Sequence, residues 1–217
     1  MVDRETKDTL IYIHAALMAY VWLIAVPLAI GLAVYGRQYQ TKSWGNQHMA
    51  IMMFGVLIPL TVAAICAFVA SGTIKARPHS LLGTIVVFSA WLQIILGIVN
   101  HILFRIRRKR NTLPSSKPWH NHLHIWFGRI IFVLAIITIP LGIRIKRPPL
   151  GVYIAFAVWV SLLTITFLTL IFNNYRLKNV NHTPSSFTST SSNPELESEN
   201  LPKSNQTIEV QHVDEKK

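Results

Sequence analysis

Four histidines stand near the starts of successive apolar stretches of this 217-residue chain: His14, His48, His79 and His124. The residues around them repeat, because a methionine follows at i+4 in the first two stretches and a glycine follows at i+4 in the other two. A neutral imidazole is the commonest metal ligand among side chains, and an ionisable residue inside an apolar segment is a functional candidate by default. The pattern therefore indicates metal ligation by histidine within the apolar part of the protein.

The apolar stretches that carry these histidines are long enough to cross a membrane. A helix needs about 20 apolar residues to span the hydrocarbon core, and the backbone polar groups of a segment in lipid must be satisfied within it, which favours helices. Four charge-free runs and a fifth broken only by one arginine qualify: Thr9–Gly36, Ser43–Ile74, Ser80–Phe104, Leu150–Asn174 and Leu123–Ile143 with Arg129. The sequence therefore predicts an all-α membrane protein of five transmembrane helices.

The end of the chain differs in composition from these segments. Residues 180–217 are rich in serine, threonine and asparagine and hold few large apolar side chains, so they cannot bury a core. We expect a membrane domain over residues 1–179 and a disordered polar tail over residues 180–217. The start of the chain lacks the basic segment of a signal peptide, so we expect no cleavage there.

Successive helices run in opposite directions, which distributes the histidines between the two membrane faces. His14 and His79 fall near the face of the N-terminus, called side A, and His48 and His124 fall near the other face, side B. Helices 1 to 4 are thus predicted to form a four-helix bundle with an imidazole pair at each face. Two haems fit such pairs, with glycine giving clearance for the macrocycle and methionine an apolar wall. The chain has one cysteine, so a C-x-x-C-H attachment is excluded and the haems must be noncovalent.

Other histidines near side B compete with the second pair. The sequence HNHLH at 120–124 also permits a small metal site, because His120 and His124 share a helical face. His120 and His122 fall at or before the mouth of the helix, so we prefer His124, which the glycine at i+4 marks. His120, His122 and His101 remain candidates for contact with a substrate, and His101 is equally well explained as an interfacial polar residue.

The charges of the membrane region are almost all positive. No Asp or Glu occurs between Thr9 and Pro194, which excludes carboxylate catalysis and carboxylate metal cages there. We expect lipid headgroups, haem propionates and a small anionic substrate to meet the cations, and no nucleic acid. Arg129, about 7 Å deeper than His124, is expected to face the bundle and balance a propionate, whereas Lys75 and Arg77 are substrate candidates on side A.

The distribution of cations also predicts the orientation. Side B carries more lysines and arginines than side A, including the cluster RIRRKR at 105–110. The positive-inside rule then places side B in the cytoplasm. The N-terminus is expected outside or in a lumen, and the C-terminal tail in the cytoplasm.

Four segments taken in order resemble the cytochrome b561 family. They are HAALMAYVW (14–22), GRQYQ with WGNQH (36–48), HSLLGTIVVFSAWLQIILG (79–97) and HIWFGR (124–129). The likeness covers roughly residues 9–175 and is greatest to the fungal-type domains that usually follow a DOMON haem domain, although we expect no attached DOMON domain here. The commonest members have six helices, whereas five are predicted here.

The resemblance implies a transmembrane ascorbate-dependent oxidoreductase of the ferric reductase type. It implies two noncovalent haem b per chain, with the iron held by His14 with His79 and by His48 with His124. Electrons would pass from a cytosolic reductant such as ascorbate to a ferric complex, monodehydroascorbate or a separate redox protein. Members of the family often form homodimers.

Two other classes of protein are compatible with the same residues. One is a haem-free membrane carrier that moves metal ions with its histidine clusters. The other is a haem-binding subunit that passes electrons only to a protein partner. A haem absorbance band excludes the first class, and electron transfer to an external acceptor in vesicles excludes the second.

Overall fold

The computed structural model describes residues 3–38, 43–73, 76–112, 116 and 118–180, and every regular element in this part of the chain is a helix. Five helical segments there are long and apolar enough to cross a membrane: Arg4–Gly36, Trp44–Ser71, Pro78–Lys109, Trp119–Lys146 and Leu150–Asn173. The prediction of an all-α integral membrane protein with five spans is therefore confirmed. The predicted polar tail lies outside the described residues except for Val180.

The first two spans each contain a π-helical segment. Span 1 consists of α1 (Arg4–Tyr20), η1 (Val21–Ala25) and α2 (Val26–Gln38), and span 2 consists of α3 (Trp44–Ala50), η2 (Ile51–Leu57) and α4 (Ile58–Ser71). Each π segment ends two residues before a proline, Pro27 or Pro59. A proline has no N–H, and its ring crowds the carbonyl four residues earlier. The wider π turn accommodates this crowding without ending the helix.

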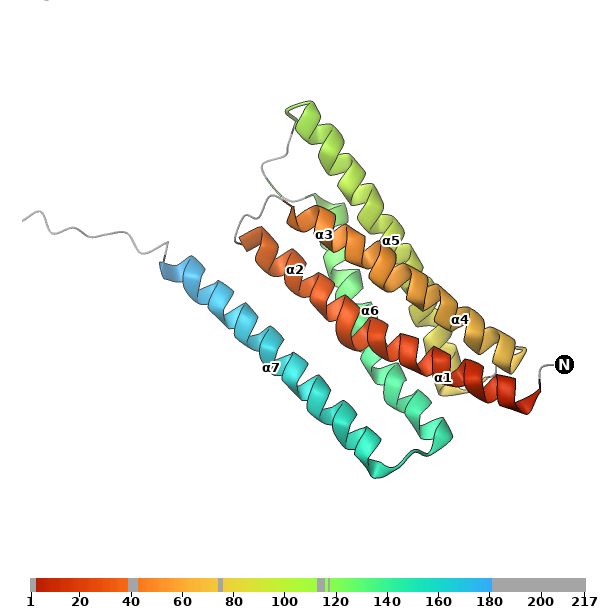
Figure 1. Ribbon diagram of the computed structural model, residues 1–217. Coiled ribbons are helices and arrows are strands. Elements are labelled where there is room, and N and C mark those ends of the chain that lie inside the picture. Colours follow the sequence, from red (N-terminus) through yellow and green to blue (C-terminus); the bar gives the residue numbers. More distant parts are fainter. Residues whose placement is uncertain (1–2, 39–42, 74–75, 113–115, 117, 181–217) are drawn as a thin grey trace, which may run out of the picture. The chain divides into compact units, whose positions relative to one another are not determined.

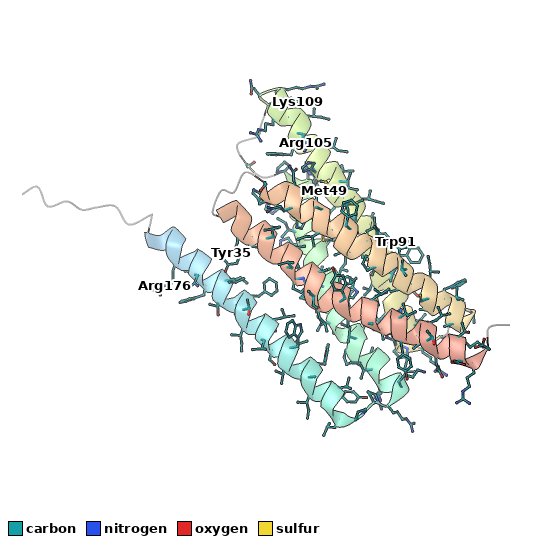
Figure 2. All side chains as sticks on the ribbon, viewed as in Figure 1. Tyr35, Met49, Trp91, Arg105, Lys109 and Arg176 are labelled. Carbon is teal, nitrogen blue, oxygen red and sulfur yellow. The ribbon has the colours of Figure 1, made fainter. Side chains whose placement is uncertain are left out.

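The remaining spans are single helices: α5 (Pro78–Lys109), α6 (Trp119–Lys146) and α7 (Leu150–Val180). Pro78 stands at the start of α5, where the missing N–H costs nothing. Asp3 caps α1 by accepting hydrogen bonds from the Thr6 backbone N–H (2.7 Å) and hydroxyl (2.9 Å). These bonds hold the pKa of the Asp3 carboxyl below its usual value. Cations gather at the far end of α5, where Arg105 and Lys109 lie (Figure 2).

The spans pack as two antiparallel pairs. Span 1 packs against span 2, since α1 lies along α4 and α2 lies along α3. The second pair consists of α5 and α6, which lie along each other (Figure 1). The buried core joins the two pairs near the middle of the spans, with Val21 and Leu60 from one pair and Ile94 and Ala135 from the other. Many large apolar side chains face outward, as expected of surfaces that contact lipid. An ion pair between Asp8 and Lys146 (2.5 Å) joins α1 to α6 at side A.

Candidate functional site

Two of the predicted ligands meet at side A. His14 of α1 and His79 of α5 have ring centroids 6.3 Å apart, and their planes are nearly perpendicular at 83°. Each ring is held through Nδ1, since His14 bonds the Ala63 carbonyl (2.9 Å) and His79 bonds the Thr138 carbonyl (3.0 Å). A carbonyl only accepts, so each Nδ1 carries the proton. The Nε2 lone pairs are therefore left available to a metal.

This arrangement fits a metal held between the two rings. A bond between a transition metal and an imidazole nitrogen is about 2 Å long. Two imidazoles on opposite sides of one ion therefore have their centroids about 6 Å apart. The His14–His79 separation of 6.3 Å matches this requirement. Backbone acceptors at Nδ1 are also the partners that metal-bound histidines ordinarily have.

The other two predicted ligands lie at side B. His48 of α3 bonds the Ala29 carbonyl of α2 through Nδ1 (2.8 Å). His124 of α6 is close enough to His48 for the two rings to interact electrostatically. Unlike the other three rings, His124 has a buried Nδ1 without a hydrogen-bond partner among the described residues. The structure thus brings together the same two pairs that the alternation of helix direction predicts.

Glycines lie against two of the imidazoles, but they are not the glycines at i+4. A methyl group placed at Gly142 would lie 2.5 Å from Cε1 of His79, and one placed at Gly97 would lie 3.1 Å from Cε1 of His124. In both cases the glycine belongs to the partner helix. At Gly128 a methyl group would instead meet the Gln93 amide nitrogen at 2.6 Å. The methyl group that Gly128 lacks would thus contact Gln93 rather than the ring of His124, and clearance for a macrocycle at Gly128 stays a prediction.

Gly83, the other i+4 glycine, has room beside it for a methyl group. A methyl group there would meet only the Thr138 methyl group, at 3.8 Å. Met18 and Met52 are partly buried against the core, and their role as an apolar wall beside a haem stays a prediction. Clearance for a macrocycle at Gly83 stays a prediction.

Arg129 does not point into the bundle, contrary to the expectation. Its side chain is exposed, and its guanidinium carbon lies 4.8 Å from the centre of the Trp126 ring. Trp126 is itself 59% exposed. Five residues along an α-helix turn a side chain by about 140°, which carries Arg129 away from the face of His124. A contact with a propionate is therefore not retained in the function proposed below.

The weaker candidates are scattered. His120 is bound to Asn100 of α5 through Nδ1 and Oδ1 (2.5 Å), His122 is exposed, and His101 is half-buried. Arg77 is exposed at the start of α5, and Lys75 lies outside the described residues. Within the described ranges, no three His, Cys, Asp or Glu side chains converge on a metal. A metal site in HNHLH therefore gains no support.

Gln93 contacts one of the predicted ligands, and its position in the sequence alone did not predict this contact. It is only 9% exposed in the middle of α5, and its Nε2 donates to the His124 carbonyl at 2.6 Å. A glutamine within an apolar run was visible in the sequence, and it is a signal for an interhelical hydrogen bond. What the sequence did not show is which helix it faces.

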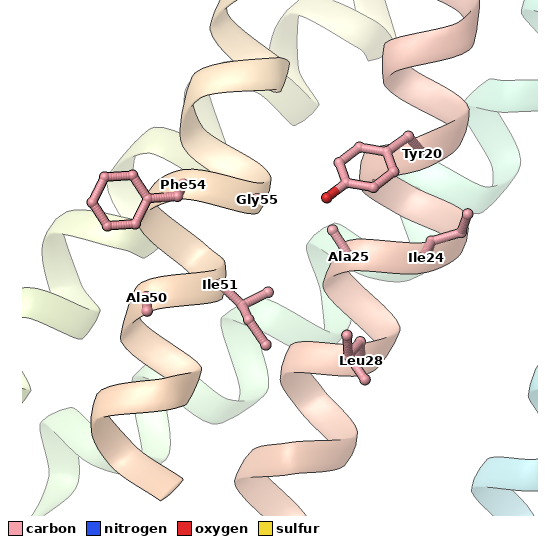
Figure 3. A pocket seen from close by; sticks show the side chains of 8 residues that line it. All are labelled: Tyr20, Ile24, Ala25, Leu28, Ala50, Ile51, Phe54 and Gly55. Atoms are coloured by element: carbon pink, nitrogen blue, oxygen red, sulfur yellow. The ribbon is translucent and has the colours of Figure 1, made fainter. Parts of the chain in front are cut away.

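An apolar hollow opens between the first two spans, away from the imidazoles. It has a volume of about 340 Å³ and is lined by residues that include Tyr20, Ile24, Phe54 and Gly55. The Tyr20 hydroxyl points across it toward the other span (Figure 3). None of the predicted site residues lines it, so the hollow is separate from the candidate site.

The fold and the paired imidazoles define a helical membrane protein with a pair of histidines near each face. The family model for eukaryotic cytochrome b561 matches residues 13–147. The chain therefore belongs to the cytochrome b561 family, whose members bind haem b and transfer electrons across membranes. No curated protein and no solved structure matches the chain.

Proposed function

We propose that this protein carries electrons across its membrane through two noncovalent b-type haems, one near each face. The donor is a small anionic reductant in the cytosol such as ascorbate, which acts at side B. The acceptor on the other side is a ferric complex, monodehydroascorbate or a separate redox protein. The observation that supports this most directly is the His14–His79 pair, with a centroid separation of 6.3 Å and both Nδ1 atoms bonded to backbone carbonyls.

The protein's part in this function is to hold and orient the cofactors. His14 and His79 would bind the side-A haem, and His48 and His124 the side-B haem. A haem iron with two imidazole ligands supplies one-electron redox chemistry without an open coordination position. Transfer is therefore outer-sphere, and no side chain has to act as an acid, base or nucleophile.

Charge at the end of α5 is consistent with an anionic donor. Arg105, Arg108 and Lys109 are exposed there, and Asn46 of α3 accepts a hydrogen bond from Arg105 at 3.4 Å. Such a cluster raises the local concentration of small anions and also attracts anionic lipid headgroups. On side A the exposed Arg77 is placed to attract an anionic acceptor.

Haem counting and vesicle transport together test this function. Purified protein should show a haem absorbance band and a reduced-minus-oxidised spectrum equivalent to two haems per chain. In vesicles loaded with ascorbate, the protein should reduce external ferricyanide. A protein without a haem band would contradict the cofactor assignment, and loaded protein that leaves ferricyanide oxidised would contradict transmembrane transfer.

Histidine variants extend the same test to each pair. His14→Ala and His79→Ala should each lose the side-A haem, and the double variant should lose little more, because one missing ligand already breaks the site. His48→Ala and His124→Ala should do the same at side B. The matched control is His122→Ala, whose exposed side chain should leave two haems in place. Loss of the same haem from His14→Ala and His48→Ala would refute the pairing.

A further inference from the structure

The same pattern of residues occurs along α5 and along α6, and these two helices run in opposite directions. The same sequence interval separates the members of four pairs: His79 and His124, Gly83 and Gly128, Gln93 and Thr138, Gly97 and Gly142. Because the two helices are antiparallel neighbours, each residue of the pattern at one end of the α5–α6 pair has a counterpart at the other end, as in an inverted repeat. The ring contacts follow it, since each histidine lies against the corresponding glycine of the other helix. The two histidines would therefore be expected to have equivalent hydrogen bonds.

The hydrogen bonds break this equivalence. His79 Nδ1 donates to the Thr138 carbonyl at 3.0 Å. The counterpart of Thr138 is Gln93, yet no such bond joins its carbonyl to His124 Nδ1. Instead, the Gln93 side chain donates through Nε2 to the His124 carbonyl at 2.6 Å. His124 Nδ1 and Gln93 Oε1 are both buried and both without a partner in the described part of the chain.

These two atoms are complementary. When Nε2 of a neutral imidazole binds a metal, Nδ1 carries the proton and needs an acceptor. The other three histidines have backbone carbonyl acceptors, at Ala63, Ala29 and Thr138. The Gln93 amide oxygen is an unused acceptor on a side chain that already contacts His124. A buried donor and a buried acceptor that stay unpaired each carry a desolvation cost, which a bond between them would remove.

We propose that Gln93 is the positioning residue of His124, and that its Oε1 accepts the hydrogen bond from Nδ1–H in the haem-loaded protein. This inference rests on the function proposed above. Gly128 leaves room for the Gln93 amide beside His124, because a methyl group at Gly128 would lie 2.6 Å from the amide nitrogen. The side-B haem is then the one of the two whose ligand is oriented by a side chain.

The proposal predicts a specific change in one haem. A hydrogen bond accepted from Nδ1–H makes the imidazole a stronger donor to the metal and favours the ferric state. Gln93→Leu removes the acceptor, so the midpoint potential of the side-B haem should rise and its low-spin electron paramagnetic resonance signal should shift. The side-A haem should keep its potential and its signal. Gln93→Glu keeps a carboxyl oxygen as acceptor and should hold the side-B potential at or below that of the wild type.

The experiment is a redox titration with haem counting and resonance spectra on the full-length protein and its variants. The side-B component is assigned as the one missing from His48→Ala. Thr84→Val is the matched control, since Thr84 is another polar side chain of α5 and its hydroxyl donates to the Ser80 carbonyl of its own helix (2.8 Å). This control should shift neither haem.

The outcomes separate the two hypotheses. A raised side-B potential in Gln93→Leu together with a retained one in Gln93→Glu supports the positioning role. Should Gln93→Leu lose the side-B haem altogether, retention of that haem at an unraised potential in Gln93→Glu supports the role as well. Unchanged spectra in Gln93→Leu, or equal shifts in the Leu and Glu variants, overturn it. A wild-type protein with fewer than two haems contradicts the proposed function instead.

Discussion

At the scale of single residues, the imidazoles depend on close approach to the backbone of a neighbouring helix. His79 reaches the Thr138 carbonyl only because its ring passes directly over Gly142, one turn further along α6. The same contact recurs between His124 and Gly97. Glycine is needed here because a β-carbon would occupy the place of the ring, and small residues are what allow helices in membranes to approach closely.

Substitution of these glycines should remove haem. In Gly142→Ala the new methyl group would lie 2.5 Å from Cε1 and 2.9 Å from Nδ1 of His79, so the ring has to leave its acceptor. We expect the side-A haem to be lost and the haem content to fall from two toward one per chain. In Gly97→Ala the new methyl group would come no closer than 3.1 Å to the His124 ring. This variant should therefore lose less of its side-B haem than Gly142→Ala loses of its side-A haem.

The control for this prediction is Gly151→Ala, because a methyl group at Gly151 meets nothing within 4 Å. Haem content and thermal stability should be measured together for all three variants. A Gly142→Ala protein that retains two haems would show that the ring moves without losing its ligand role.

The residue scale also shows what the sequence could and could not predict. The four histidines and their pairs follow from position and helix direction, which need no knowledge of side-chain orientation. The error at Arg129 concerns rotation about a helix axis, and so does the contact of Gly128 with Gln93, which the sequence did not predict. An apolar run that is hydrophobic all round gives no periodicity from which that rotation is fixed, and α6 is such a run.

At the scale of elements, the prolines of the first two spans have a consequence for α7. Pro27 has no N–H to donate to the Leu23 carbonyl, four residues earlier. The Trp159 indole of α7 donates to that carbonyl at 3.0 Å. No residue of the membrane-spanning window of α7 is buried, so this bond is a specific link between α7 and span 1.

Removal of the indole donor should loosen α7. Trp159→Phe keeps an aromatic ring but removes the indole N–H that donates to the Leu23 carbonyl. Interhelical hydrogen bonds in membrane proteins contribute about 0.6 to 1.7 kcal/mol, so we expect a measurable fall in unfolding temperature in detergent. Haem content should stay near two per chain, because α7 carries none of the predicted ligands.

Thr164→Val is the control for Trp159→Phe, because within the described part of the chain the Thr164 hydroxyl bonds only the Val160 carbonyl of its own helix (2.8 Å). Its unfolding temperature should match that of the wild type. Equal stability of Trp159→Phe and the wild type would mean that lipid or another group satisfies the Leu23 carbonyl as well as the indole does.

The elements themselves were predictable to within a few residues, because long apolar runs have few alternatives in lipid. Span 1 begins earlier than its apolar run, at Arg4, since Asp3 caps the helix ahead of the run. The π segments were not predicted, although both prolines were visible. Proline signals a disturbed helix, but whether the chain kinks, breaks or widens depends on the neighbouring helices.

At the scale of the whole molecule, the uneven distribution of charge is what bears on orientation. The chain has a formal net charge of +12, and its acidic residues are confined to the two ends. The exposed cations at the end of α5 lie on side B, the side on which the chain leaves its fifth span. Side B is therefore proposed to be cytoplasmic, which also sets the proposed direction of electron flow.

Glycosylation gives a direct test of this orientation. The tail contains two acceptor sequences, Asn181-His182-Thr183 and Asn205-Gln206-Thr207, which lie outside the described residues. Glycan is added only on the lumenal side, so neither asparagine should be modified when the protein is made in a eukaryotic cell. An acceptor sequence appended through a polar spacer before Met1 serves as the positive control and should be modified. The measurement is the change in gel mobility after glycosidase treatment. Modification of the natural tail without modification of the added sequence would place side B outside. The donor would then act at the His14–His79 pair, and electrons would leave through His48 and His124.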